Sequence, residues 1–333
     1  MIKDSKMTNA NDHIKLDTKD RKLLSALDFN ARMPYTELGR KIGMSKQGAE
    51  YKLNTLIRKG VIKGFYPVIN VPKLGYLYCR LCLGLQNVTP EKEQEILTYL
   101  RAEPRFFWIF STQGTFDFLI VMWAKSLTEF AIAVADLLTN YGEYVKVKNE
   151  SLVTDVVHYS NRYLLGNPGT TEIHVAETAA RVDIDATDRE ILNLLCTDAR
   201  TPLVQIAQKL KISAQVVAYK IKRMEKLKLI EGYRPIIDHR TLGYTYYKLW
   251  VNLNYADMGQ IRKLYSYIKE NPLVLYAIKG IGMPEDLDVE IMVKTNEELY
   301  QFIKDLKLRF PSLIGDYKTF MFINTEKVRY LPF

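Results

Sequence analysis

Two cysteines, Cys79 and Cys82, have the spacing of half a zinc site. They lie in an apolar run typical of a β-strand, where residues three apart point to opposite faces of the sheet. The third cysteine, Cys196, stands alone, so no second pair completes four ligands. We therefore expect the cysteines to pack as small apolar side chains, with no metal site. So few cysteines also indicate a reducing compartment without a disulfide framework.

Residues suited to catalysis are equally sparse. The chain has four histidines, none at a metal-ligand spacing: His13, His158, His174 and His239. The pair Gly280 and Gly282 lacks the third glycine of a phosphate-binding loop. We therefore expect no catalytic residues, no cofactor and no enzymatic activity.

The net charge of +9 is concentrated in two windows of the sequence. Residues 37–66 hold seven Lys or Arg against two Glu, and residues 205–234 hold eight against two. These windows exceed the whole positive excess, so the remainder of the chain is slightly acidic. A local basic patch on a near-neutral body is typical of a protein that binds a polyanion, and we expect double-stranded DNA as the partner.

The two basic windows are parts of an internal repeat with an offset of 168 residues. Residues 62–67 match 230–235, and residues 74–76 match 242–244. The register holds without a gap from Asp20 to Gly114 in the first copy, and correspondingly in the second. The chain is therefore a duplication of one unit.

Each copy begins with three short amphipathic helices. In the first copy the second helix opens at Pro34, and the third begins at Ser45, a favoured N-cap residue. Only Gly43 and Met44 separate these two helices, which is the short turn of a helix-turn-helix. Residues 60–65 then predict a turn and a short hairpin, the wing of a winged helix-turn-helix.

The third helix supplies the candidate DNA contacts, because its polar face points away from its apolar stripe. A polar outward face is also the norm for surface helices, so the helix-turn-helix context and the charge carry this assignment. Lys52 and Lys220 lie on the flank, where a phosphate contact and an intramolecular ion pair are equally good interpretations. The candidates are Ser45, Lys46, Gln47, Tyr51, Lys52, Asn54 and Arg58 in the first copy and Ser213, Gln215, Tyr219, Lys220, Lys222 and Lys226 in the second.

The second part of each copy alternates strands and helices as βαββαβ, the order of a ferredoxin-like fold. The elements expected in the first copy span about 77–86, 90–102, 106–113, 116–124, 127–140 and 144–157. The fold class is α+β, with two copies of a winged helix-turn-helix followed by a ferredoxin-like sensor domain. The expected segments are a disordered tail (1–14), helix-turn-helix 1 (15–70), sensor domain 1 (75–164), a linker (165–182), helix-turn-helix 2 (183–238) and sensor domain 2 (243–333).

This pattern resembles the Lrp/AsnC family, the leucine-responsive or feast/famine regulators, from about residue 16 to the end of the sequence. The residues that carry the resemblance in the first copy are Leu16, Asp17, Asp20, Ala31, Arg32, Glu37, Leu38, Met44, Ser45, Lys52, Leu53, Leu56, Gly60, Val61, Ile62, Gly64, Leu74 and Gly75. Those in the second are Ile184, Asp185, Asp188, Ala199, Arg200, Ile212, Ser213, Leu229, Ile230 and Gly232. The resemblance implies a sequence-specific transcription regulator whose sensor domain mediates oligomerisation and binds an amino-acid-like effector.

The family's effector-site turn, Gly-x-x-Asp, corresponds to Gly114, Thr115 and Asp117. The resemblance implies that these residues bind the effector, although a tight strand turn that needs glycine explains them equally simply. In the second copy the turn is stretched over residues 282–288, three residues longer. We therefore expect any effector to prefer the first copy.

Family members ordinarily carry one copy in each chain, so we expect the two copies here to pair with each other and mimic the family's dimer. Chains should then associate further, as homodimers. No stretch approaches the ~18 apolar residues of a membrane helix, and the first residues have no apolar leader. We expect a cytoplasmic protein with no membrane partner.

Two other functions fit the same domains. Sirohaem decarboxylases resemble Lrp/AsnC proteins, but their His- and Arg-bearing motif is not found in this sequence. An architectural protein would bind DNA through the same helices with little sequence preference.

Overall fold

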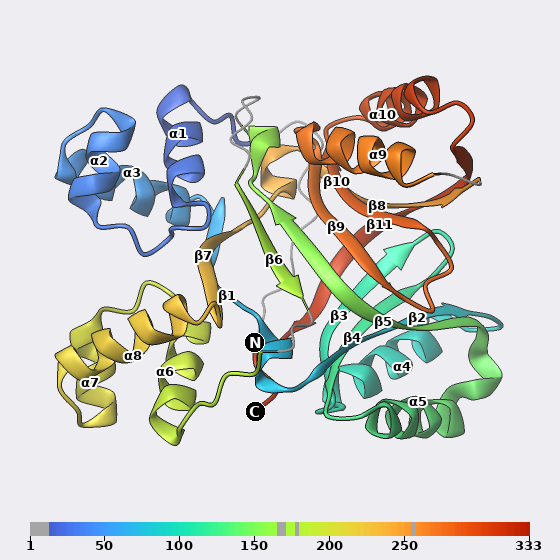
Figure 1. The fold of residues 1–333 in the computed structure, drawn as a ribbon, viewed down its shortest axis with the longest axis horizontal. Helices are drawn as coiled ribbons and strands as arrows, with labels where there is room; N and C mark the ends of the chain where they lie inside the picture. The colour runs from blue at the N-terminus through green and yellow to red at the C-terminus, as the bar shows by residue number, and fades with distance from the viewer. Residues whose placement is uncertain (1–12, 165–170, 177–179, 255–256) are drawn as a thin grey trace.

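The computed structural model describes residues 13–164, 171–176, 180–254 and 257–333. Two small helical domains lie at one side of the molecule and two α/β domains at the other (Figure 1). Most of the expected disordered tail, together with parts of the expected linker, lies outside the described residues. Among the described residues, no helix is both long and apolar enough to cross a membrane.

The helical domains follow the predicted three-helix pattern. The first comprises α1 (Thr18–Leu27), α2 (Tyr35–Ile42) and α3 (Lys46–Arg58), and the second comprises α6 (Ala186–Thr197), α7 (Leu203–Leu210) and α8 (Ala214–Lys226). The side chain of Ser45 accepts a hydrogen bond from the backbone N–H of Gly48, and that of Ser213 from Val216, so both serines are N-caps as predicted. Gly43 takes the left-handed conformation at the turn, with φ of 68°.

The prediction of a short hairpin at residues 60–65 was wrong. The chain continues after residue 65 as one strand, β1 (Ile62–Ile69), and its partner is the equivalent strand of the other copy, β7 (Ile230–Ile237). Tyr66 lies opposite Arg234, and these two residues occupy equivalent positions in the repeat. The pseudo-twofold axis that relates the copies therefore passes through this two-stranded ribbon.

The predicted βαββαβ elements are present in both sensor domains. The first has β2 (Leu77–Leu85), α4 (Pro90–Ala102), β3 (Phe106–Gln113), β4 (Phe118–Ala124), α5 (Leu127–Tyr141) and β5 (Val145–Tyr159). The second has β8 (Thr245–Leu253), α9 (Met258–Glu270), β9 (Val274–Ile281), β10 (Leu287–Val293), α10 (Asn296–Arg309) and β11 (Ile314–Val328). Short 3₁₀ turns follow three strands and one helix: η1 (Val71–Leu74) follows β1, η2 (Gly142–Tyr144) follows α5, η3 (Arg162–Leu164) follows β5 and η4 (Arg240–Leu242) follows β7.

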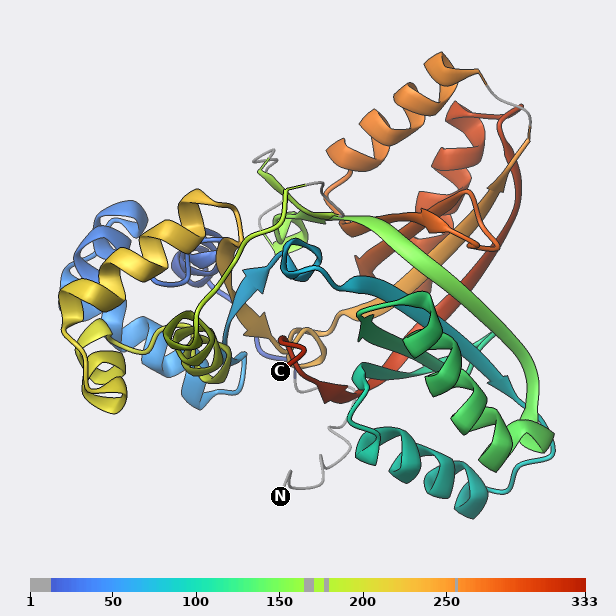
Figure 2. The same ribbon diagram turned by 60° about the horizontal axis from the view of Figure 1, so that its bottom comes forward.

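The two sensor sheets join into one closed structure. The last strand of each copy pairs with the second strand of the other, β5 with β9 and β11 with β3, and β5 also pairs with β2. Eight strands of the described sheet thus close on themselves as an antiparallel barrel, with the helices outside (Figure 2). The two copies therefore pair within one chain, as expected.

Part of the expected linker is a strand. β6 (Glu172–Ala176) pairs with β5 and extends the sheet beyond the barrel. Residues 173 and 175 are apolar and buried, and this alternation makes the segment strand-like despite its position between domains.

Alternation along β2 assigns one face to the helices and the other to the barrel interior. Cys79 and Leu81 pack with α4 and α5, whereas Cys82 packs inside the barrel with Phe116 and Trp250. The two cysteines thus point to opposite faces, which is the geometry that the sequence predicted.

Candidate functional site

The recognition helices α3 and α8 present their predicted polar faces to solvent. Ala49, Leu53 and Leu56 are buried, as are the equivalent residues of α8. Tyr51 and Tyr219 are each 69% exposed, an unusual position for an aromatic side chain. Exposed with them are Gln47, Asn54, Arg58, Gln215, Lys222 and Lys226.

Backbone and arginine contacts hold the helical domains to the ribbon symmetrically. The backbone N–H of Ala31 donates to the carbonyl of Tyr233 (2.9 Å), and that of Ala199 donates to Phe65 (3.0 Å). Arg32 donates to the carbonyl of Ala199, while its equivalent Arg200 donates to that of Ala31. Each domain is therefore fixed by the other copy, and both recognition helices lie on the same side of the molecule (Figure 2).

The side chains of Lys52 and Lys220 contact carboxylates of their own helical domains. Lys52 Nζ lies 2.8 Å from Asp17 and 2.9 Å from Asp20, and its side chain is only 16% exposed. Lys220 makes the same pair of contacts with Asp185 and Asp188. These carboxylates raise the pKa of each ammonium, and they also cap the first helix of each domain. The intramolecular ion pair is the interpretation that the geometry favours.

Carboxylates from outside the two basic windows also neutralise other cations. Arg234 is buried against Asp28, with its Nε 2.7 Å from the carboxylate, and Arg223 contacts Asp188. The exposed positive charge is therefore smaller than the sequence windows indicate. Within the described part of the chain, the exposed cations in α3 and α8, or directly after α3, that have no ion pair are Lys46, Arg58, Lys59, Lys222 and Lys226.

The Gly114 turn has an evident structural role. Gly114 has φ of +140°, and a Cβ there would lie 2.9 Å from the Cβ of Phe320, so a larger residue cannot replace it without a shift. Asp117 Oδ2 accepts the backbone N–H of Leu85 at 2.6 Å, whereas Thr115 is exposed. The carboxylate of Asp117 therefore ties the turn to the end of β2.

The second copy keeps this arrangement with a different residue from the one expected. Asp286 accepts the backbone N–H of Leu253 at 2.8 Å, and Leu253 is the equivalent of Leu85. The turn after Gly282 is one residue longer than in the first copy, and the predicted difference of three residues was wrong. In the alignment of the two copies, Asp117 was matched with Asp288. The side chain of Asp288 lies inside the barrel and does not hold this turn.

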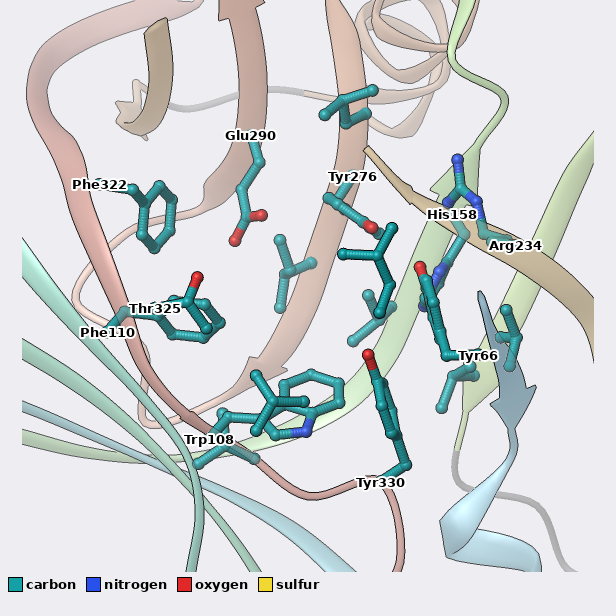
Figure 3. Close-up of a pocket in the computed structure, with 18 of the residues that line it drawn as sticks. Tyr66, Trp108, Phe110, His158, Arg234, Tyr276, Glu290, Phe322, Thr325 and Tyr330 are labelled. Atoms are coloured by element: carbon teal, nitrogen blue, oxygen red, sulfur yellow. The ribbon is translucent and has the colours of Figure 1, made fainter. Parts of the chain in front are cut away.

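A cavity of about 330 Å³ lies between the β1/β7 ribbon and the barrel (Figure 3). Its lining includes His158, His239 and Arg234, residues that are far apart in sequence. Sequence reasoning missed this cavity because no local motif links them. Single charged residues within otherwise apolar strands, at Arg80 and Lys248, were the available signal, since both line it from inside the barrel.

Family models match both helical domains of the chain. An AsnC-type helix-turn-helix domain covers residues 184–225, and a winged helix-turn-helix DNA-binding model covers residues 16–63. The chain is similar to the HTH-type transcriptional regulator Ptr1 of Methanocaldococcus jannaschii, with 31% identity over 36% of this chain and 80% of that protein. It is also similar to the HTH-type transcriptional regulator LrpA of Pyrococcus horikoshii, with 29% identity over 38% of this chain and 84% of that protein.

A solved structure that resembles nearly the whole chain is that of the siroheme decarboxylase NirDL. It covers 94% of this chain and 93% of its own, with a TM-score of 0.63 and 13% sequence identity. At that identity the likeness shows the shared fold alone. The regulators, in contrast, match in sequence over little more than a third of this chain, which is less than one repeat of 168 residues. The chain therefore belongs to the Lrp/AsnC family of helix-turn-helix transcription regulators, and it carries the regulator unit twice.

Proposed function

We propose that the chain is a sequence-specific transcription regulator that places α3 and α8 in major grooves of one DNA duplex. The observation that carries the proposal is the pair of equivalent, exposed helices on one side of the molecule, fixed about a pseudo-twofold axis. DNA has twofold symmetry of its own, so two such helices engage half-sites about one helical turn or a multiple apart. Such a protein acts in the cytoplasm.

Gln47 and Gln215 are the proposed base readers, because each lies in the first turn of its helix, where base contacts concentrate. A glutamine amide can pair with N6 and N7 of adenine. One turn further along, both copies have a tyrosine, Tyr51 in the first and Tyr219 in the second. The next position differs, because the equivalent of Asn54 in the second copy is Lys222. The remaining proposed contacts are Lys46, Arg58 and Lys226, with Ser45 and Ser213 placing the helix N-termini against the phosphate backbone.

The shared and differing residues together predict an imperfect inverted repeat as the operator. Selection from random duplexes tests this directly. Gln47→Ala should cost roughly 1–3 kcal/mol and relax the base preference in one half-site only. Gln215→Ala is the matched variant and should relax the other half-site. Perfect palindromes would contradict the asymmetric operator, and the absence of any preferred sequence would favour the architectural alternative.

We propose further that an amino-acid-like effector binds near Gly114, Thr115 and Asp117. The exposed Thr115 hydroxyl beside a fixed backbone turn supports the proposal. Calorimetry with a panel of amino acids tests it. A Thr115→Val variant should lose the heat of binding, whereas no heat with any amino acid would leave the turn with its structural role alone.

We propose that two chains associate through their sensor domains into a homodimer, in which each chain already contains a pair of copies that mimics a dimer. Exposed apolar side chains on the outer helices, including Leu127, Ile132 and Leu308, support an outer contact surface. Light scattering at micromolar concentration should give twice the chain mass, and a strict monomer would contradict the proposal.

A sirohaem decarboxylase-like activity is the second candidate, and the central cavity with two histidines is the observation that favours it. We infer that regulation is the better supported function. The volume of the cavity lies at the low end of the ~300–1,000 Å³ range of small-molecule pockets. Arg80 and Lys248 already form ion pairs with a carboxylate of the protein, so they are not free to bind the carboxylates of a tetrapyrrole. Absorbance of the purified protein, and its titration with iron uroporphyrin III, test the alternative: a Soret band that persists through gel filtration would favour the enzyme.

A further inference from the structure

The cavity between the ribbon and the barrel has aromatic walls. Tyr66 from β1 and Tyr330 stack with their ring centroids 5.0 Å apart and their planes at 10°. Figure 3 shows Trp108 and Tyr330 along one side, and Tyr66 beside His158 and Arg234, with Glu290 and Phe322 facing this group across the space. Flat, apolar walls of this kind suit a planar aromatic molecule.

Three buried nitrogen atoms at the cavity lack hydrogen-bond partners in the described part of the chain: Arg234 Nη1, Trp123 Nε1 and His158 Nδ1. Their residues are only 2%, 3% and 7% exposed. The other nitrogens of Arg234 are engaged, since Nε bonds to Asp28 at 2.7 Å and Nη2 to the carbonyl of Tyr159 at 3.0 Å. A buried donor without an acceptor is destabilising, so the N–H groups of Arg234 and Trp123 identify where ligand acceptors would lie, whereas the neutral imidazole of His158 offers one donor and one acceptor.

The charges around the cavity indicate that its ligand is uncharged. Asp28 already balances Arg234, and Arg80 and Lys248 contact the carboxylates of Asp288, Glu285 and Glu290. Burial holds the pKa of His158 well below its ordinary value, so its imidazole is neutral. A ligand anion would therefore be buried without a free countercharge, which is strongly unfavourable.

The cavity has an opening through which a ligand can enter. Thr325 and Val328 of β11 line it and are exposed to solvent, whereas Arg234 and His158 at the far side are buried. A ligand would pass these two residues and meet the unpartnered donors at the inner end.

We propose that this cavity binds an uncharged, planar aromatic molecule whose carbonyl oxygens accept from Arg234 and Trp123. The site is separate from the Gly114 turn, because no residue of that turn lines it. The β1/β7 ribbon forms one wall, with residues 66–69 and 234–237, and the same ribbon connects the two helical domains. Occupancy therefore shifts the affinity for DNA, a consequence that rests on the proposed function.

Fluorescence of the full chain tests binding without DNA, since two of its three tryptophans, Trp108 and Trp123, line the cavity. The probes are 9-fluorenone, fluorene, which has the same rings without the carbonyl, and 9-fluorenone-4-carboxylate, which adds a charge. We expect 9-fluorenone to quench with at least tenfold higher affinity than either of the others. Equal affinity of fluorene and 9-fluorenone, or tighter binding of the carboxylate, would overturn the proposal.

Two variants locate the bound probe. Thr325→Phe narrows the entrance and should reduce affinity at least tenfold, whereas Lys318→Phe, exposed on the same strand but outside the cavity, should leave it unchanged. Asp28→Asn combined with Arg234→Met removes the donor without stranding a buried charge, and it should reduce the preference for 9-fluorenone over fluorene. Undiminished binding in Thr325→Phe would place the probe elsewhere and overturn the proposal.

The effect on DNA is measured separately, with the selected operator and saturating 9-fluorenone. A change of threefold or more in affinity supports the coupling. If the probe binds in the cavity and no operator is found, the proposed function fails while the ligand site stands. If an operator binds with unchanged affinity, the coupling fails and the function stands.

Discussion

The two copies of the repeat differ most inside the barrel, although they share the same strands. Arg80 of the first copy and Lys248 of the second occupy equivalent positions, and both are buried. Opposite Arg80 on the neighbouring strand stands Val121, whereas opposite Lys248 stands Glu290. In the same way, Leu119 of the first copy corresponds to Asp288 of the second. Among the described residues, both copies thus supply a cation to the interior, but only the second supplies the carboxylates.

This difference makes the two copies complementary. Arg80 contacts Asp288 and Glu285 from the other copy, and Lys248 contacts Asp288 and Glu290 from its own. Two first copies would bury a pair of arginines without a carboxylate, and two second copies would bury six carboxyl groups with two lysines. Because unpaired buried charges are strongly destabilising, only the mixed pair is balanced. Duplication within one chain thus allowed a specificity that an identical pair cannot have.

The largest expected effect follows from giving the second copy the first copy's residue, Asp288→Leu. This variant leaves Arg80 and Lys248 without their shared carboxylate, and we expect the free energy of unfolding to fall by roughly 3–5 kcal/mol. Urea denaturation measures the loss. Asp316→Leu, on an exposed part of β11, is the matched control and should cost less than ~1 kcal/mol. Similar losses for both variants would contradict the complementarity.

The arginine contacts between the two copies are symmetric, so removing either arginine should destabilise the protein to the same extent. Arg32→Ala and Arg200→Ala each delete a charged donor to backbone carbonyls of the other copy, and each should cost roughly 1.5–3 kcal/mol. Thermal or urea unfolding measures both, with the exposed Arg40→Ala as control. A loss confined to one of the two arginines would show that the helical domains are held unequally.

A pH titration of stability separates the copies further, because the interior holds three carboxyl groups against two cations. Burial raises the pKa of Glu290 to about 8 and that of Glu285 to about 7. The folded protein therefore retains up to two protons that the unfolded chain releases above pH ~4.5, and stability falls as the pH rises towards 8. Each retained proton contributes a slope of at most roughly 1.4 kcal/mol per pH unit.

Glu290→Gln supplies the control for that titration, because a neutral amide needs no proton. Its stability near pH 4.5 should be close to that of the unaltered chain, whereas between pH 5 and 8 its slope should be shallower. An identical slope in both proteins would exclude Glu290 as a group that retains a proton.

Local patterns in the sequence predicted the elements well and their partners poorly. The bounds expected for α4 and β3 agree with the structure, and Ser45 caps α3, because spacing and caps are local properties. The pairing of β1 with β7 depends on a strand 168 residues away, so residues 60–65 by themselves resembled a hairpin. Asp286 was missed for a related reason: the alignment favoured matching aspartates, whereas the hydrogen bond to Leu253 decides the true register.

In the candidate site, too, local properties could be predicted from the sequence and long-range contacts could not. Periodicity placed Gln47 and Tyr51 on the exposed face of α3, and the structure has them there. Whether Lys52 faces DNA or a carboxylate depends on Asp17 in another helix, and no spacing along the chain settles it. The central cavity was invisible because its lining comes from most of the strands.

The smallest expected effect concerns how salt weakens DNA binding, where the recognition helices differ by one charge. Lys222 is exposed on α8, and its equivalent on α3 is Asn54. Lys222→Asn should reduce the slope of log affinity against log salt by about one, and Asn54→Lys should increase it by about one, because the slope counts the phosphates neutralised. Lys52→Ala should leave the slope unchanged, since its ammonium already pairs with Asp17 and Asp20. Operator titrations between 50 and 200 mM salt measure all three, with Lys304→Ala on α10 as a control distant in sequence from both helices. A loss of one unit in Lys52→Ala would mean that the lysine leaves its carboxylates when DNA binds.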